Sequence, residues 1–351
     1  MISEPPKLDL DDADRNRRLT MAAQEILGRY QERIVDGLLE ATALLPPEML
    51  EPSRYHLGLQ PGARPGKALR PTLTMILAEG LGGPPGWADP LAAAVQLVHD
   101  FSLLHDDIVD EDQARRGQPA LWVKAGMPTA LNTGDALLTA AFLVISGSKV
   151  PAEISRTACA SLGTATLEMV GGQQADITAT GKPPAELSVY LRMVELKTGA
   201  LLGAAAAMGA IAAGRVADMV AACEAFGRTL GIAFQLRDDT LGVFGDSEET
   251  GKPVGNDLLR GKQGLPLLLA LNANGELGKT ARAWLLPGGL SAPELQAAVA
   301  LLRERGIAER CQGLTSTWTE HALVALAKLP LESRVAAEVE LLCRWLGERW
   351  S

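Results

Sequence analysis

The chain of 351 residues is 47% hydrophobic and 21% charged, which excludes disordered and collagen-like proteins and, at roughly 150 residues per domain, allows about two domains. Its net charge of −9 has the wrong sign for binding nucleic acid through a basic surface, so we expect no nucleic-acid partner. The four cysteines form no CxxC pair, so we expect neither a zinc site nor a disulfide framework, and a cytoplasmic location fits.

Helical periodicity runs through the chain. Aromatic residues make up only 4%, which favours close-packed helices over sheets. The longest uncharged stretch, 198–214, is shorter than the ~20 residues that a membrane span needs, so we interpret it as an internal helix and expect no stable membrane insertion. Breaks with Pro or Gly separate the predicted helices, which are, in chain order, 15–45, 67–81, 88–113, 128–146, 152–178, 185–213, 216–244, 264–272, 278–285 and 291–348.

These elements predict an all-α fold, a single large helical bundle with a central cavity. No break resembles a long flexible linker, so residues 1–351 are expected to form one domain. Residues 1–14 are expected to be a flexible tail, and residues 290–351 to be C-terminal helices with a packing role.

The most informative segment, 99–119, carries the first acidic cluster. On a helix, Asp106 and Asp110 project from the same face one turn apart, with Asp107 beside them. These like charges repel, whereas a divalent cation such as Mg²⁺ binds carboxylate oxygens and shares its remaining positions with phosphates. Arg115 and Arg116 follow, and guanidinium groups match phosphate oxygens. A solvated acidic helix end is the alternative interpretation.

A second acidic cluster, in residues 234–257, repeats this chemistry. Asp238 and Asp239 begin it, Gln235 lies one turn earlier, and Lys252 and Lys262 follow. Residues 99–112 and 238–249 together hold eleven of the 42 acidic residues and no Lys or Arg, so the net charge is concentrated in two places. Two such clusters facing each other across a bundle would hold a metal-bridged diphosphate between them.

Other candidate residues are weaker when taken singly. Lys67 and Arg70 are neighbours on a helix that begins just after Gly66, and an ordinary helix start is the alternative. Lys197 and Thr198 precede Gly199, which is expected to relax the helical hydrogen bonding, although a surface position or a kink explains such a triplet equally well.

The histidines near the first cluster have ordinary explanations too. His99 lies two turns before Asp106 on the same helical face, and His105 is adjacent to the acidic pair. A core or capping role is the alternative for both residues, and His99 is the stronger functional candidate.

Together these residues resemble the trans-prenyltransferases, the short-chain isoprenyl diphosphate synthases with an all-α fold. The resemblance covers residues 60–266 and rests on motifs in the family's order and spacing: GKALRP (66–71), DDIVD (106–110) followed by RRGQP, GQQAD (172–176), KTGALL (197–202), FQLRDD (234–239) and GKPVGNDLLRGK (251–262). It implies a Mg²⁺-dependent head-to-tail (1'-4) condensation of isopentenyl diphosphate with an allylic diphosphate, in an enzyme that is usually a homodimer.

The resemblance also implies residue roles. Isopentenyl diphosphate would contact Lys67, Arg70, His99 and Arg116, and the allylic diphosphate would contact Arg115, Lys197, Thr198, Gln235, Lys252 and Lys262. Three Mg²⁺ ions, for which Mn²⁺ can substitute, would bind Asp106, Asp110 and Asp238, with Asp107 and Asp239 supporting them. Arg115 and Lys197 would also stabilise the leaving diphosphate as the allylic cation forms, and no side-chain nucleophile is required.

Two features of the motifs bear on product and activity. Where the family's second motif ends in Asp this chain has Gly242, so we expect water or Asp239 to complete the third metal site. Phe101 and Ser102, the fifth and fourth residues before the first motif, resemble the pattern that stops growth at the C20 product, geranylgeranyl diphosphate, and Val98 is a further chain-length candidate.

Two other functions stay open. A terpene cyclase shares the fold and the first motif but has no isopentenyl site, so the presence of Lys67, Arg70 and Arg116 favours condensation. A non-catalytic partner subunit would have lost one aspartate cluster, whereas here only the position of Gly242 departs from the pattern.

Overall fold

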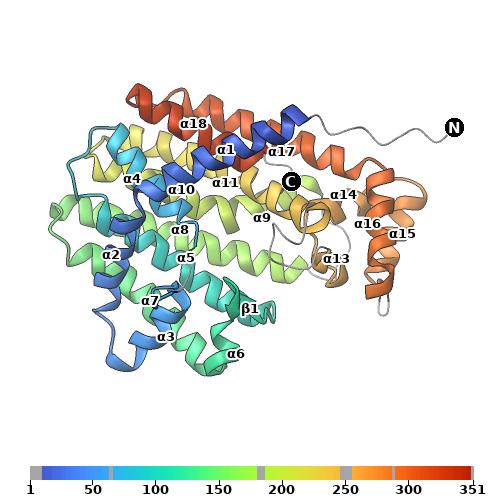
Figure 1. Ribbon diagram of the computed structural model, residues 1–351, viewed down its shortest axis with the longest axis horizontal. Coiled ribbons are helices and arrows are strands. Elements are labelled where there is room, and N and C mark those ends of the chain that lie inside the picture. The colour runs from blue at the N-terminus through green and yellow to red at the C-terminus, as the bar shows by residue number, and fades with distance from the viewer. Residues whose placement is uncertain (1–9, 63–65, 180–185, 246–254, 287–288, 349–351) are drawn as a thin grey trace.

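The computed structural model describes residues 10–62, 66–179, 186–245, 255–286 and 289–348, and it confirms the all-α prediction (Figure 1). Within these residues the only sheet is a hairpin of two short strands, β1 (Ala114–Arg115) and β2 (Gln118–Pro119). The helices are α1 (Leu10–Arg29), α2 (Gln31–Thr42), α3 (Pro47–Leu57), α4 (Leu69–Gly80), α5 (Asp89–Val109), α6 (Leu121–Ala125), α7 (Met127–Ser146), α8 (Ala152–Ala179), α9 (Leu187–Val194), α10 (Ala200–Ala212), α11 (Ala217–Phe244), α13 (Asn256–Leu259), α14 (Leu265–Leu271), α15 (Glu276–Trp284), α16 (Leu295–Glu304), α17 (Ile307–Leu326) and α18 (Ser333–Glu348).

Helix α10 is at the centre of the bundle. It packs against α4, α8 and α11, and every one of its residues is buried, which confirms the interpretation of the uncharged stretch as an internal helix. Two segments, Met127–Ser146 and Leu187–Ala212, are long and apolar enough to span a membrane. Because the apolar part of the second is 83% buried inside the protein, its hydrophobicity is explained by the core.

The first and last parts of the chain lie together. Helix α18 packs against α1, α4 and α11, and α17 packs along α11, so the C-terminal helices cover the bundle (Figure 1). Helices α14 to α17 share a second apolar cluster with α9 and the end of α11. Figure 1 shows α15 and α16 standing across one end of the long helices.

The predicted boundaries fail in three places near the N-terminus and the hairpin. The first helix starts at Leu10 rather than residue 15, with Asp14 and Arg18 forming an i, i+4 ion pair of 2.8 Å, and a turn at Tyr30 divides it from α2. Residues 47–57 lie in a predicted break but form α3, and Pro47 can begin this helix because the first turn of a helix needs no proline N–H. The segment 114–119, predicted as a break, forms the hairpin.

Candidate active site

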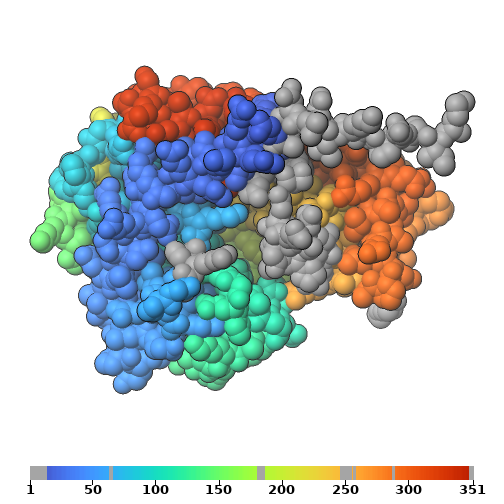
Figure 2. Space-filling view, in the orientation of Figure 1, coloured from blue at the N-terminus to red at the C-terminus, as the bar shows by residue number. Residues whose placement is uncertain are grey.

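One cavity of about 690 Å³ lies between the end of α5, the middle of the bundle and the end of α18. Figure 2 shows the corresponding face hollowed between the blue and teal N-terminal helices and the orange C-terminal helices. The predicted site residues that line the cavity are Lys67, Arg70, His99, Asp110, Arg115, Arg116, Lys197, Gln235, Asp238, Asp239 and Lys262. The sequence-predicted site residues that are not among its lining are Val98, Phe101, Ser102, Asp106, Asp107 and Thr198. Lys252 lies outside the described residues.

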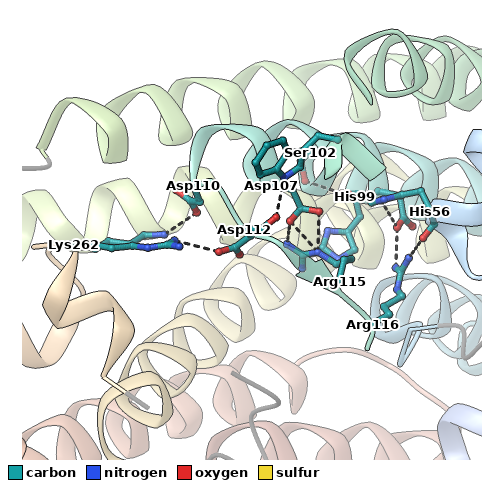
Figure 3. A network of polar contacts seen from close by, with 12 residues as sticks. His56, His99, Ser102, Asp107, Asp110, Asp112, Arg115, Arg116 and Lys262 are labelled. Carbon is teal, nitrogen blue, oxygen red and sulfur yellow. Dashed lines mark hydrogen bonds and ion pairs between the residues drawn. The ribbon is translucent and has the colours of Figure 1, made fainter. Parts of the chain in front are cut away.

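At the end of α5 the three aspartates of the first motif have different surroundings, and Figure 3 shows two of them, Asp107 and Asp110. Asp107 is buried and accepts hydrogen bonds from the Arg115 guanidinium, whose Nε lies 3.0 Å from its Oδ1. Asp110 lines the cavity with the Lys262 ammonium 3.3 Å away. Burial raises the pKa of Asp106 above its usual value, a shift that Lys197 opposes and the Asp110 carboxylate reinforces.

The hairpin after α5 presents the two predicted arginines. Arg116 and Gly117 both have positive φ, 55° and 76°, as the central residues of a two-residue hairpin turn require. This conformation is unfavourable for Arg, and strong contacts hold it in place. The Arg116 guanidinium donates 2.8 Å to the buried Asp100 carboxylate and also bonds to the carbonyl of His56 (Figure 3).

Asp100 is the anchor of this arrangement, and its role was not predicted from the sequence. Its other oxygen accepts a 2.5 Å hydrogen bond from Gln96, and the His56 ring lies 3.3 Å from the oxygen that Arg116 binds. Burial alone would raise the pKa of Asp100, but the Arg116 guanidinium and His56 hold it well below its usual value. Asp100 is therefore charged and fixes the position of Arg116.

Arg70 and His99 form the next part of the cavity wall. Arg70 donates to the His99 Nε2 atom over 3.2 Å, so that nitrogen carries no proton and the ring is neutral. Burial and the neighbouring Arg70 both hold the pKa of His99 well below its ordinary value. Burial also lowers the pKa of Arg70 to about 10, at which it is still cationic near neutral pH. The site thus contains a partly buried cation, Arg70, whose hydrogen-bond partner His99 is neutral.

The predicted relaxation of the helix at Gly199 is confirmed, since Glu195–Gly199 forms a π-helical turn, η1, between α9 and α10. Lys197 on this turn forms a 2.5 Å ion pair with Asp176 at the end of α8. Gly172 makes that approach possible, because a Cβ atom there would lie 2.3 Å from the Lys197 backbone nitrogen. Asp176 lines the cavity and belongs to the GQQAD motif, which was the available sequence signal for it.

A hydrogen-bond chain leads from the π-helical turn to the second acidic cluster. Thr198 donates to Gln235, and Gln235 donates to Asp239, each over 2.7 Å. The Tyr190 hydroxyl, 2.5 Å away, and the Leu265 backbone N–H, 2.9 Å away, donate to the other oxygen of Asp239. Burial raises the pKa of Asp239 to about 6 despite these donors. Gln235 therefore bonds to Asp239, which lies four residues after it on α11.

The loop that follows α13 reaches back to the end of α5. Besides the contact of Lys262 with Asp110, the Arg260 guanidinium lies 3.1 Å from Asp112, whose backbone carbonyl accepts a hydrogen bond from the Trp122 indole. Asp112 and Arg260 were not predicted as site residues. Arg260 lies within the motif at 251–262, but its partner Asp112 is 148 residues away and outside the quoted motifs, so no sequence pattern pointed to the pair.

The carboxylates fit a hard divalent cation by donor chemistry, since Asp110 and Asp238 line one cavity and Asp106 is close to both Asp110 and Lys197. Among the described residues, no three acidic, histidine or cysteine side chains come close enough together to bind a metal as they stand. The Lys262 ammonium lies 3.3 Å from one oxygen of Asp110, so a metal ion that binds this carboxylate would share it with the ammonium or displace the ammonium.

The candidate chain-length residues lie beside the cavity in α5. Phe101 is buried and meets the His105 ring edge-on at 4.8 Å, while Ser102 donates to the His99 carbonyl and Val98 is fully buried. On the same helix, Leu103 lines the cavity and was not predicted. Gly134 of α7 accommodates the His105 ring, because a Cβ atom there would lie 2.5 Å from it.

Comparison with known proteins places this geometry in context. A sequence profile described as polyprenyl synthetase matches residues 51–302. A geranylgeranyl diphosphate synthase of Mycobacterium tuberculosis is 36% identical over 345 residues, 95% of each chain, and a (2E,6E)-farnesyl diphosphate synthase of Mycobacterium bovis is 36% identical over 355 residues, 98% of this chain and 97% of the relative. The crystal structure of geranylgeranyl pyrophosphate synthetase from Pyrococcus horikoshii superposes with a TM-score of 0.83 at 30% identity, covering 93% of this chain and 98% of that one.

Proposed function

The chain belongs to the polyprenyl synthetase family and is a prenyltransferase, and we propose that it condenses isopentenyl diphosphate with an allylic diphosphate to give mainly geranylgeranyl diphosphate. One observation carries the proposal. Carboxylates from both acidic clusters line the same cavity as cations from α4, the hairpin, the π-helical turn and the loop after α13. Such a cavity suits two diphosphates, one of them bridged to the acidic clusters by metal.

Arg70 is the strongest support for an isopentenyl diphosphate site. Arg70 is partly buried beside a neutral imidazole, and burial lowers its pKa, so its charge is not fully compensated by the surrounding anions; the diphosphate group would provide that compensation. Lys67 lines the same wall. Arg116 lines the cavity while its guanidinium is held by Asp100, so we propose that it presents its remaining donor capacity to the substrate.

On the allylic side, we propose that Asp106, Asp110 and Asp238 hold three Mg²⁺ ions, or Mn²⁺ in their place. When bound, these ions would withdraw charge from the diphosphate leaving group. Lys197, Lys262, Arg115 and, outside the described residues, Lys252 would neutralise the same group. Asp107 and Asp239 already accept several hydrogen bonds, and we propose that they fix the geometry of the neighbouring metal ligands.

Product length is proposed to depend on Phe101, which packs edge-on against His105 on the helix whose residues His99 and Leu103 line the cavity. Phe101→Ala is expected to extend the products beyond C20, because it removes the ring that meets His105 at 4.8 Å. Ser102→Ala is the control on the adjacent residue, since it removes a hydroxyl and leaves the volume nearly unchanged. Products no longer than those of the parent enzyme from Phe101→Ala would refute the role of this ring.

We further propose a cytoplasmic homodimer that associates through α7 and α8. Leu131 and Leu143 of α7 are exposed, as are Leu167, at 76%, and Val170 of α8. Apolar side chains in such number on neighbouring helices are typical of a self-complementary interface. Leu167→Glu should convert a dimer to a monomer in light scattering, whereas Val324→Glu, at an exposed apolar position of α17, should not.

The activity itself is tested by incubating the protein with labelled isopentenyl diphosphate and dimethylallyl, geranyl or farnesyl diphosphate over a range of Mg²⁺ concentrations. We expect incorporation and a main product of C20. No incorporation with any allylic substrate would favour a non-catalytic partner subunit, and a released hydrocarbon or alcohol would favour a terpene cyclase.

A further inference from the structure

Helix α18 contributes directly to the cavity, although the sequence suggested only packing for residues 290–351. Trp345 and Leu346 of this helix line the cavity, and α18 packs against α4, which carries Arg70. Both residues lie beyond the segment 51–302 that the family profile matches. The wall that they form therefore lies outside the segment that the family profile matches.

The Trp345 ring lies beneath the ammonium of Lys67, a proposed contact of isopentenyl diphosphate. The side chain of Trp345 is 3% exposed, and the Lys67 ammonium lies 5.5 Å from the centroid of its ring. A cation within about 6 Å of an aromatic centroid is attracted by the negative face of the ring, and Trp has the strongest such face. Lys67 is exposed at the edge of the cavity, where its long side chain can adopt many conformations. Attraction to the indole favours the conformations in which the ammonium lies over the ring.

The indole N–H of Trp345 has no hydrogen-bond acceptor among the described residues, in contrast to that of Trp122, which donates 2.8 Å to the carbonyl of Asp112. This difference matters for the experiment. Replacing Trp345 by Phe breaks no hydrogen bond within the described residues, so its effect reports on the contact between ring and ammonium.

We propose that Trp345 is a positioning residue that holds Lys67 for isopentenyl diphosphate. The inference rests on the proposed function, because it assigns Lys67 to that substrate. The indole would lower the entropy that the Lys67 side chain loses when it engages a diphosphate, and substrate binding benefits without any contact between Trp345 and the phosphates. The allylic diphosphate, on the other side of the cavity, would be unaffected.

Steady-state kinetics of Trp345→Phe and Trp345→Leu test the proposal. We expect KM for isopentenyl diphosphate to rise about twofold in Trp345→Phe and about five- to tenfold in Trp345→Leu, with kcat and KM for the allylic diphosphate unchanged. Trp318→Phe is the matched control: its ring meets His321 at 5.4 Å on α17 and does not line the cavity, so no change is expected.

The decisive comparison is made in a Lys67→Gln background. If Trp345 acts through Lys67, Trp345→Leu raises KM for isopentenyl diphosphate no further once the ammonium is gone. An equal increase in both backgrounds, a rise in KM for both substrates, or a change in kcat alone would overturn the proposal. Wild-type protein that consumes no isopentenyl diphosphate would instead refute the proposed function. Trp345→Phe keeps the test valid if Trp345→Leu does not fold.

Discussion

The two acidic clusters balance their charge in different ways. At the end of α5, Asp100, Asp107, Asp110 and Asp112 are each paired with an arginine or lysine. In α11, Asp239 is surrounded by neutral donors, and its pKa is raised to about 6. The first cluster therefore has cations that metal or phosphate can displace. In the described part of the second cluster, neutral donors support Asp239, and both Asp238 and Asp239 line the cavity.

The largest effect should come from the cavity-facing carboxylates of both clusters. Asp110→Asn and Asp238→Asn are each expected to lower kcat by on the order of 10²–10³-fold, because each removes a carboxylate that would hold the metal ions facing the diphosphate leaving group. Labelled-substrate assays over a range of Mg²⁺ concentrations measure the loss, and urea unfolding should change by less than about 1 kcal/mol because neither residue is a core residue.

Asp107→Asn and Asp239→Asn provide the matched comparison. These carboxylates accept several hydrogen bonds, so their replacement is expected to lower the free energy of unfolding by about 1–3 kcal/mol. A fully active Asp238→Asn enzyme together with a stable but inactive Asp239→Asn enzyme would reverse the roles assigned to the two residues of the second cluster.

Asp100 should give the next largest effect, on stability rather than turnover. Asp100→Asn breaks a buried ion pair with Arg116 and is expected to lower the free energy of unfolding by about 3 kcal/mol at pH 7. Because its pKa in the folded state is depressed, this stability is present above the unfolded value of about 4 and is lost as the pH falls below it. Urea unfolding of both proteins from pH 7 to about pH 3 measures the difference, which should shrink only in the acidic range. A constant difference would show that charge is not the cause.

The helical bundle, both acidic clusters and the π-helical turn at Gly199 were predictable because each has a local signal, whether periodicity, like charges at one-turn spacing or a glycine beside a polar pair. The local signal that Asp107 has different surroundings from Asp106 and Asp110 is weaker. Consecutive helical residues are turned by about 100°, so Asp107 cannot share the face of Asp106 and Asp110. The burial of Asp107 against Arg115 follows from that rotation.

Other parts of the site were not predictable because they depend on contacts between distant segments. Lys197 meets Asp176, Arg260 meets Asp112, and Lys67 meets Trp345, and nothing in the spacing of these residues indicates that the chain brings them together. Tyr190 is a similar case, since its hydroxyl reaches Asp239 across 49 residues. Tertiary packing, and not the motif itself, decides which cation or hydrogen-bond donor contacts each carboxylate.

Gly172→Ala is expected to have an intermediate effect. The added methyl would lie 2.3 Å from the Lys197 backbone nitrogen, and we expect a loss of about 1–3 kcal/mol in unfolding free energy, together with a higher KM for the allylic diphosphate. Gly171→Ala is an adjacent control with nothing within 4 Å, where the helix preference of Ala should stabilise by up to about 1 kcal/mol. Equal effects of the two substitutions would mean that the close approach of α8 and the π-helical turn is unimportant for Lys197.

The smallest effect concerns the pair of Arg260 and Asp112, which ties the loop bearing Lys262 to the first cluster. Arg260 is partly exposed, so the pair should contribute at most about 1 kcal/mol, and we expect Arg260→Gln to raise KM for the allylic diphosphate about three- to fivefold. Asp112→Asn should do the same, and the double variant should be no worse than either single one, because each substitution removes the same contact. Lys279→Gln, which breaks an exposed pair with Glu276 on α15, is the control and should leave KM unchanged. Additive losses in the double variant would mean that Arg260 and Asp112 act separately, and the first cluster would then be linked to this loop through Lys262 and Asp110 alone.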